Sequence, residues 1–185
     1  MEIRWHARGG QGAIIASELL AEAAMEEGRY FQAFPDYGAE RMGAPVRVYT
    51  RISNHCIQEH SPISEPDVVV VLDITLFDLV DVTEGLKRKG ALIVNTDMPP
   101  QEIKRILKLE QTVYTVNASR IAFDVFGRNI PNTPMIGALI KATGIVSIRS
   151  AISIVQDRLA ARLSRSIGER NAQAVERAYA ETKRD

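Results

Sequence analysis

The sequence predicts an α/β protein: a single Rossmann-like domain with a mostly parallel sheet flanked by helices and a helical C-terminal region. The uninterrupted apolar run at residues 68–72 is typical of a strand that is covered on both faces of a parallel sheet, and residues 91–95 are expected to form another buried strand. The segments between the strands are long enough for helices that make right-handed parallel crossovers. Because the chain has 185 residues and no linker-like stretch, we expect one domain over residues 1–185.

The first elements are a strand, a glycine loop and a helix. Residues 3–6 contain a β-branched and an aromatic residue and are expected to form a short strand. After the loop, residues 13–28 are rich in Ala, Leu and Glu and end in a glycine suited to the position that follows a helix. A second strand is expected at residues 30–34, where Pro35 breaks it.

A polar, glycine-rich loop at residues 36–44 precedes a strand with alternating character. The alternation over residues 46–52 predicts a half-buried strand, with Val46, Val48, Thr50 and Ile52 on one face. The opposite face carries Arg47, Tyr49 and Arg51, so we expect this face to be basic.

The chain then continues the alternation of strands and helices. Around the buried strand at residues 91–95 we expect helices at residues 76–89 and 101–109, followed by a strand at residues 112–116. The remainder is expected to be helical. One helix is expected at residues 118–126 and ends before Gly127; the next has Thr133 as its N-cap and Pro134 as its first residue, and runs through residue 142. Two more are expected at residues 147–163 and at residues 169–182, the second with an apolar stripe of Ala172, Val175 and Tyr179.

The composition disfavours several classes of protein. Lysine plus arginine (23) equals aspartate plus glutamate (23), so there is no overall positive field for nucleic acid. No stretch of about 20 apolar residues predicts a membrane span, and no signal-peptide pattern is present. Cys56 is the only cysteine, which favours a reducing, cytoplasmic location. His55, Cys56 and His60 lack a completing set of ligands, so no metal site is expected.

The glycine loop is the sharpest local feature. Glycines at Gly9, Gly10 and Gly12, with Gln11 between them, let the backbone turn tightly and approach a phosphate, and the following helix N-terminus adds partial positive charge. The loop is an incomplete nicotinamide-dinucleotide fingerprint, because Ile15 stands where glycine or alanine is required. A tight turn without any ligand stays open as the alternative.

Two arginines and an asparagine are further candidates for ligand binding. Arg41 lies in the glycine-rich loop and Arg47 on the basic strand face, and arginine makes forked bonds to phosphate or carboxylate. The alternative is a solvated loop and strand face. Asn95 ends a buried strand, where ligands collect in parallel sheets. No catalytic residue is predicted, and no Gly-x-Ser-x-Gly elbow surrounds any serine.

Ordered segments along nearly the whole chain carry a resemblance to a known family. The segments are IRWHARGGQG (residues 3–12), QAFPDYGAERMGAP (32–45), PDVVVVLD (66–73), LIVNT (92–96) and IPNTPMIGA (130–138). Together they resemble the gamma subunit of the 2-oxoacid:ferredoxin oxidoreductases, with most similarity to pyruvate:ferredoxin oxidoreductase, also called pyruvate synthase.

The resemblance implies a gamma-subunit catalytic domain of a hetero-oligomeric enzyme that is inactive alone. The reaction implied is the CoA-dependent, reversible oxidative decarboxylation of a 2-oxoacid, pyruvate first, to acyl-CoA, CO2 and reduced ferredoxin. Thiamine diphosphate, Mg2+ and iron–sulfur clusters are then held by alpha, beta and delta-type partner subunits, and ferredoxin accepts the electrons. The residues expected to bind CoA are Arg8, Gly9, Gly10, Gln11, Gly12, Arg41, Arg47 and Asn95.

Two other functions stay open on the residues alone. One is a stand-alone nicotinamide-nucleotide oxidoreductase, which the glycine loop would serve despite Ile15. The other is a non-catalytic nucleotide-binding or scaffold module, which needs only the same loop and no partner cofactors.

Overall fold

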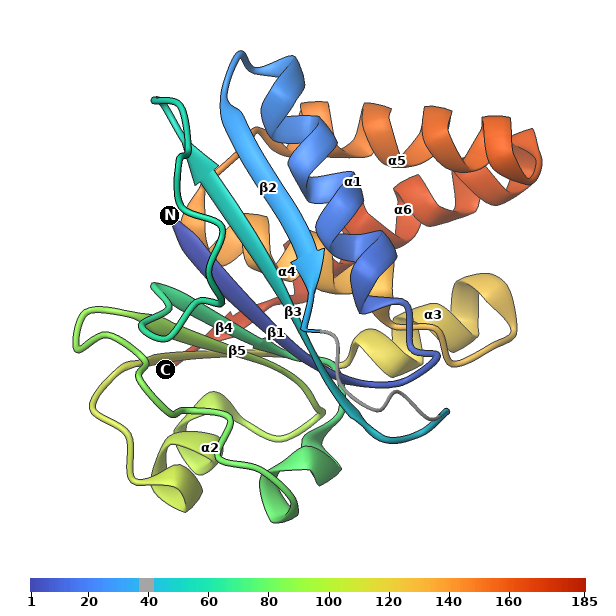
Figure 1. The fold of residues 1–185 in the computed structure, drawn as a ribbon. Helices are drawn as coiled ribbons and strands as arrows, with labels where there is room; N and C mark the ends of the chain where they lie inside the picture. Colours follow the sequence, from blue (N-terminus) through green and yellow to red (C-terminus); the bar gives the residue numbers. More distant parts are fainter. Residues whose placement is uncertain (37–41) are drawn as a thin grey trace.

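The computed structural model of the protein describes residues 1–36 and 42–185. The chain forms one seven-stranded sheet in the order β2-β3-β1-β4-β5-β6-β7 (Figure 1). The strands are β1 (Glu2–Arg8), β2 (Tyr30–Pro35), β3 (Pro45–Ser53), β4 (Val68–Val71), β5 (Ala91–Asn95), β6 (Thr112–Val116) and β7 (Lys183–Arg184). The helices are α1 (Ala13–Glu26), the 3-10 helix η1 (Ile74–Asp78), α2 (Pro100–Leu107), α3 (Ala118–Phe126), α4 (Asn132–Thr143), α5 (Ile148–Arg162) and α6 (Arg165–Glu181).

The centre of the sheet is parallel, which confirms the predicted fold class. β1 pairs in parallel with β4, β4 with β5, and β5 with β6. β3 lies between β1 and β2 and is antiparallel to both. β7 adds an antiparallel edge beside β6.

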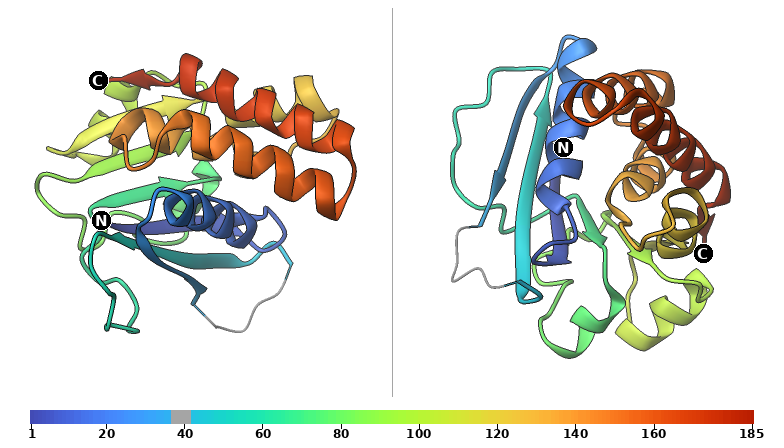
Figure 2. Two further views of the ribbon diagram at one scale, coloured as in Figure 1. Left: turned by 90° about the horizontal axis from the view of Figure 1, so that it is seen from above. Right: turned by 90° about the vertical axis from the view of Figure 1, so that its right-hand side faces the viewer.

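Each face of the sheet covers a separate hydrophobic cluster. Alternate residues of β4 divide between them: Val68 and Val70 belong to the larger cluster, and Val69 and Val71 to the smaller. The larger cluster packs under α1, α3, α4, α5 and α6, whereas the smaller lies under η1 and α2 (Figure 2). Burial on both faces explains why the run at residues 68–72 is uninterrupted.

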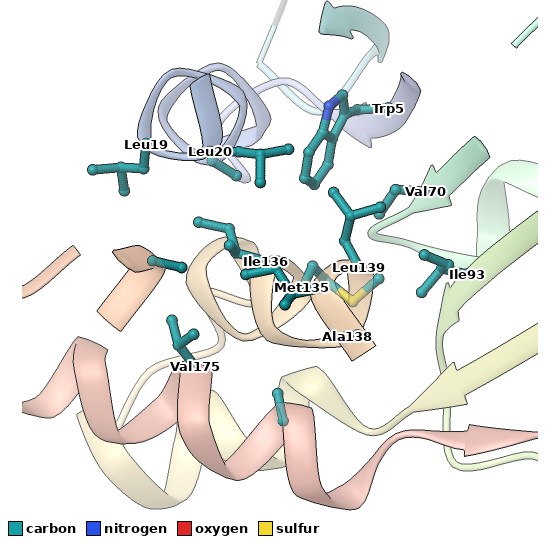
Figure 3. Packing of buried hydrophobic residues seen from close by; sticks show 14 of the residues in the cluster. Trp5, Leu19, Leu20, Val70, Ile93, Met135, Ile136, Ala138, Leu139 and Val175 are labelled. Atoms are coloured by element: carbon teal, nitrogen blue, oxygen red, sulfur yellow. The ribbon is translucent and has the colours of Figure 1, made fainter. Parts of the chain in front are cut away.

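The core of the larger cluster lies between β1 and α4. Trp5 is fully buried beside Leu20, Leu139 and Val70 (Figure 3), and its indole Nε1 donates to Thr50 Oγ1 at 2.9 Å. Behind α4, Gly137 meets the backbone of α6: a Cβ at Gly137 would collide with the carbonyl oxygen of Val175. The absence of a side chain at this position therefore sets how closely α4 and α6 approach.

The prediction of a helix at residues 76–89 is wrong. Only η1 is helical there, and turns follow it. Asp81 accepts hydrogen bonds from the backbone N–H of Thr83 at 2.9 Å and from its hydroxyl at 2.7 Å, which closes a local turn. Such side-chain bonds compete with helix formation, and Gly85 follows with φ +68°.

The strand predicted at residues 46–52 is confirmed as β3, but it is not half-buried as expected. Tyr49 is 2% exposed and Arg51 is 5% exposed, so both faces of β3 are covered in this region. Arg51 Nε donates to Glu2 Oε1 at 2.9 Å, and Arg51 Nη2 lies 3.6 Å from Glu59 Oε1. The connection that carries Glu59 therefore folds over the strand, and acidic residues neutralise the buried guanidinium.

The predicted helix boundaries hold at some ends and fail at others. Gly28 (φ +75°) and Gly127 (φ +69°) end α1 and α3 as expected. Thr133 is not an N-cap, because α4 already begins at Asn132 and the Thr133 hydroxyl donates to Asn171 Oδ1 at 2.7 Å. Among the helices of residues 1–36 and 42–185, none combines the length and the apolarity that a membrane crossing requires.

Candidate functional site

The glycine loop lies between β1 and α1, at the carboxyl edge of the parallel strands. Gly10 has φ +95°, and Gly12, which precedes the first turn of α1, has φ +78°. No side chain caps α1, and the first-turn N–H groups of Ala13, Ile14 and Ile15 donate to no other residue that the structure describes. The N-terminus of α1, which carries a partial positive charge, therefore has N–H groups that could bind an anion at the loop.

Asp73, directly after β4, holds the loop in place. Its Oδ2 accepts from Gln11 Nε2 at 2.9 Å and from Arg8 Nε at 3.2 Å, and its Oδ1 accepts from the backbone N–H of Thr75 at 3.0 Å. Partial burial opposes ionisation, but the hydrogen bonds from Thr75 and Gln11 and the charge of Arg8 lower the pKa of Asp73 below its usual value. The carboxylate is therefore charged at neutral pH and keeps these donors together.

Arg8 and Gln11 fasten the loop on its other sides. Gln11 Oε1 accepts from the backbone N–H of Arg8 at 2.8 Å, and Arg8 Nη1 donates to the carbonyl oxygen of Gly43 at 3.1 Å. The backbone N–H of Gly9 donates to Ala44 at 2.8 Å, and that of Gly43 donates to Gly9 at 3.0 Å. The structure thus brings Arg8 and the segment from Gly9 to Gly12 together as one rigid loop.

Arg47 lies on the same sheet face as Arg8, above a buried pair. The β1–β3 register places Arg47 opposite His6, and the Arg47 side chain is 38% exposed with Glu84 at 3.8 Å. Beneath it, Arg4 Nε donates to His6 Nε2 at 3.1 Å, and Arg4 Nη2 donates to the carbonyl oxygens of Val82 and Glu84. A second guanidinium therefore lies close to Arg47, inside the fold.

His6 is neutral at physiological pH. Burial, with the charges of Arg4 and Arg47, lowers the pKa of His6 to about 3. His6 accepts a hydrogen bond from a permanent cation, so its Nε2 carries no proton. His6 consequently holds Arg4 in place and is not a general acid or base for neutral solution.

The buried neutral His6 predicts that acid destabilises the protein. In the unfolded chain His6 binds a proton below its pKa of 6.5, whereas in the folded protein it stays neutral down to about pH 3. The free energy of unfolding therefore falls as the pH falls below 6.5. We expect the free energy of unfolding to be about 2 kcal/mol lower at pH 5 than at pH 7, measured by urea denaturation. His6→Gln, which can still accept from Arg4, is expected to remove most of this difference. An equal pH dependence in the parent and in His6→Gln would contradict a neutral, buried His6. The carboxyl groups with lowered pKa values, such as Asp73 and Asp81, change stability only nearer pH 4, so they do not account for a loss between pH 7 and pH 5.

The remaining predicted site residues are placed differently. Asn95 is 7% exposed; its Nδ2 donates to the carbonyl oxygen of Leu72 and to Ser119 Oγ, both at 2.8 Å, and its Oδ1 accepts from the Ser119 N–H at 3.0 Å. Asn95 thus ties the ends of β4 and β5 to α3, and its contact with a ligand stays a prediction. Arg41 lies outside the described residues.

Asn132 joins the loop from a distant part of the chain. Its Nδ2 donates to the carbonyl oxygen of Gly12 at 3.4 Å, and a Cβ built on Gly12 would lie 2.5 Å from the same nitrogen. In the sequence, Asn132 belongs to the motif of residues 130–138 and is not among the predicted site residues. Only the shared motif of residues 130–138 could have signalled it, because no local pattern connects Asn132 to Gly12.

Comparison with known proteins identifies the family. The family model for pyruvate ferredoxin/flavodoxin oxidoreductase matches residues 2–181. The common gamma subunit of the pyruvate/ketoisovalerate oxidoreductases of Pyrococcus furiosus is 48% identical over 98% of this chain and 97% of its own length. The pyruvate synthase subunit PorC of Methanocaldococcus jannaschii is 47% identical over 98% of this chain and 96% of its own.

Solved structures agree with the sequence relatives. The crystal structure of the pyruvate oxidoreductase subunit PORC of Thermotoga maritima superposes with a TM-score of 0.87 at 40% identity, over 100% of this chain and 98% of that one. The 2-oxoglutarate:ferredoxin oxidoreductase of Magnetococcus marinus shares the fold with a TM-score of 0.78 at 19% identity, over 97% of this chain and 30% of that one. The resemblance seen in the ordered motifs is confirmed. The chain belongs to the pyruvate ferredoxin/flavodoxin oxidoreductase family, in which it matches gamma subunits over its whole length.

Proposed function

We propose that this gamma subunit binds CoA and presents its thiol to an acyl intermediate held on partner subunits. The observation that carries the proposal is the uncapped N-terminus of α1 behind a fixed glycine loop. Free N–H groups at a helix N-terminus are a ready site for phosphate, and CoA carries a diphosphate and a 3′-phosphate. The Magnetococcus marinus protein of the same fold has coenzyme A and succinyl-CoA bound, which supports the choice of ligand.

The complete reaction would be the reversible oxidative decarboxylation of a 2-oxoacid, pyruvate first, with ferredoxin as electron acceptor. We assign thiamine diphosphate, Mg2+ and the iron–sulfur clusters to alpha, beta and delta-type subunits. Among residues 1–36 and 42–185, no group of His, Cys, Asp and Glu is placed to hold a metal ion, which supports this assignment for Mg2+ and the clusters. The chain alone is therefore expected to be inactive, and we place the complex in the cytoplasm.

The contribution of this chain would be binding and orientation. The first-turn N–H groups of α1 would bind a phosphate, and Arg47, which is partly exposed, would add charge near the same edge. Arg8 would act mainly through the loop, since Asp73, Thr75 and Gly43 already receive its donors. Holding CoA in this way fixes the direction of the thiol, which is a proximity effect. CoA supplies the sulfur that takes the acyl group.

Gly12→Val tests the loop in the assembled complex. Valine would have to adopt φ +78°, and its Cβ would press on the Asn132 amide. We expect the KM for CoA to rise by at least about tenfold, the size of one lost charge-assisted contact, while the KM for pyruvate stays within about twofold.

Gly28→Val is the matched control for this measurement. Gly28 follows the other end of the same helix at φ +75°, and a Cβ added there would meet no described atom within 4 Å. Valine at this position therefore has the same backbone strain but no collision. The CoA kinetics of this variant should match those of the parent complex. A folded, assembled Gly12→Val complex with an unchanged KM for CoA would refute the role of the loop.

A further inference from the structure

An apolar groove adjoins the glycine loop: Ile15 in the first turn of α1 and Asn132, which donates to Gly12, both line it. It has a volume of about 550 Å3 and opens between the start of α1, the end of α3 and the turn that joins α5 to α6. Four large apolar side chains on its wall remain exposed to solvent: Ile15 (40%), Ile130 (39%), Leu163 (66%) and Ile167 (38%). We call it the α5–α6 groove. Side chains of this kind gathered at one place mark a binding surface.

The groove is built on rigid elements. α5 and α6 form a hairpin that extends beyond the sheet (Figures 1 and 2). At its tip Gly168 contacts the backbone of α5 so closely that a Cβ would collide with the carbonyl oxygen of Gln156. On the floor, the buried hydroxyl of Thr133 donates to Asn171 Oδ1 at 2.7 Å, which joins α4 to α6. The shape of the groove is therefore set before anything binds.

The charges around the groove are of one sign. Arg128 and Arg170 line it, and no aspartate or glutamate does so. Neither arginine forms an ion pair with any residue in the described part of the chain. Two other arginines of the α5–α6 hairpin do form ion pairs: Arg158 with Glu22, and Arg165 with Glu169 at 2.8 Å. The groove thus offers apolar walls and two cations that pair with no acidic residue among residues 1–36 and 42–185.

We propose that the α5–α6 groove is the docking site for a segment of a partner subunit that inserts large apolar side chains and carries carboxylates for Arg128 and Arg170. The inference rests on the assembly of this chain with other subunits. The groove shares Ile15 and Asn132 with the proposed CoA site, so assembly and CoA kinetics are measured separately. Complementary charge specifies the occupant, because apolar anchors with acidic neighbours would satisfy both features of the groove.

A second copy of this chain fits the charges poorly. A two-fold symmetric contact through the groove would bring the Arg128 and Arg170 side chains of one copy towards those of the other. Like charges facing each other across an interface oppose binding. A partner segment with carboxylates meets no such repulsion.

Leu163→Glu in the co-expressed complex tests the proposal. The new carboxylate removes an apolar contact and repels an acidic segment, so we expect association with the partner subunits to weaken by at least about tenfold, measured by sizing and native mass across a dilution series. Arg170→Glu should weaken association in the same way, and it leaves the apolar packing untouched. Leu79→Glu is the matched control, since Leu79 is 55% exposed after η1 on the opposite side of the sheet.

The outcomes separate this proposal from the CoA role. Weakened assembly in both groove variants, with parental assembly in Leu79→Glu, supports the docking site whatever the KM for CoA. Parental assembly of a folded Leu163→Glu and of Arg170→Glu overturns it. A wild-type chain that is a dimer alone, and that Leu163→Glu converts to a monomer, also overturns it in favour of a second copy. If Leu163→Glu does not fold, as judged by its thermal transition, Arg170→Glu alone decides.

Discussion

Replacing Trp5 with alanine is expected to lower the free energy of unfolding by about 3–5 kcal/mol. Trp5 is fully buried in the larger cluster, between α1 and α4, and alanine would leave a cavity among Leu20, Val70 and Leu139 (Figure 3). The substitution also removes the donor to Thr50 Oγ1, a hydroxyl that is itself completely buried. Urea denaturation of the isolated chain would measure the loss.

Two further variants divide this loss into its parts. Trp5→Phe keeps most of the ring but still leaves Thr50 without its donor, so it should cost less than Trp5→Ala by roughly 1–3 kcal/mol. Tyr30→Ala, at an aromatic residue that is 50% exposed on the edge strand β2, should change stability by no more than about 0.5 kcal/mol. A Trp5→Ala protein within about 1 kcal/mol of the parent would show that the core does not depend on this ring.

Gly137→Ala is expected to destabilise the protein by about 3 kcal/mol, although it adds only one methyl group. The new Cβ would collide with the carbonyl oxygen of Val175 and lie 3.0 Å from the backbone nitrogen of Tyr179. Both obstacles are backbone atoms of α6, so they cannot turn aside as a flexible side chain could. Relief requires the separation of α4 from α6 along the face that they share.

Gly144→Ala is the control for this second variant. Gly144 follows α4 at φ +60° with nothing within 4 Å, so alanine there meets backbone strain but no collision. We expect a cost of about 1 kcal/mol by thermal or urea denaturation. Equal costs at the two positions would mean that helix packing at Gly137 is loose, against the contacts described above.

The strands that could be predicted are those whose hydrophobic pattern reflects their burial. β4 is apolar throughout, and β5 is apolar up to Asn95, because helices or turns cover both faces; this pattern is visible in the sequence. β7 has no such pattern. It consists of two exposed basic residues, held at the sheet edge by Asp185, whose carboxylate accepts from the Val113 N–H at 2.9 Å. That contact spans 72 residues, and no local signal announces it.

The candidate site was predictable only in its local part. The glycine loop and Arg8 stand together in sequence, so their shared location could be inferred before the structure. Asp73 and Asn132 could not, because Gln11 meets Asp73 across 62 residues and Gly12 meets Asn132 across 120. The family motifs contain both residues but do not say that they converge. For Asn95, the place at a strand end was predictable, whereas the bonds of its side chain to Leu72 and Ser119 were not; its contact with a ligand stays a prediction.

The turns that follow η1 have a consequence for the dynamics of the protein. They cover the smaller cluster without a regular helix, and Arg4 fastens them to β1 through the carbonyl oxygens of Val82 and Glu84. Segments of this kind open locally at lower free energy than the body of a domain, so their amide hydrogens exchange with solvent sooner. Such an opening would expose Arg4 and His6 to solvent, and His6 has a lowered pKa mainly because it is buried. We therefore expect His6 of the folded protein to take up a proton only when this segment opens.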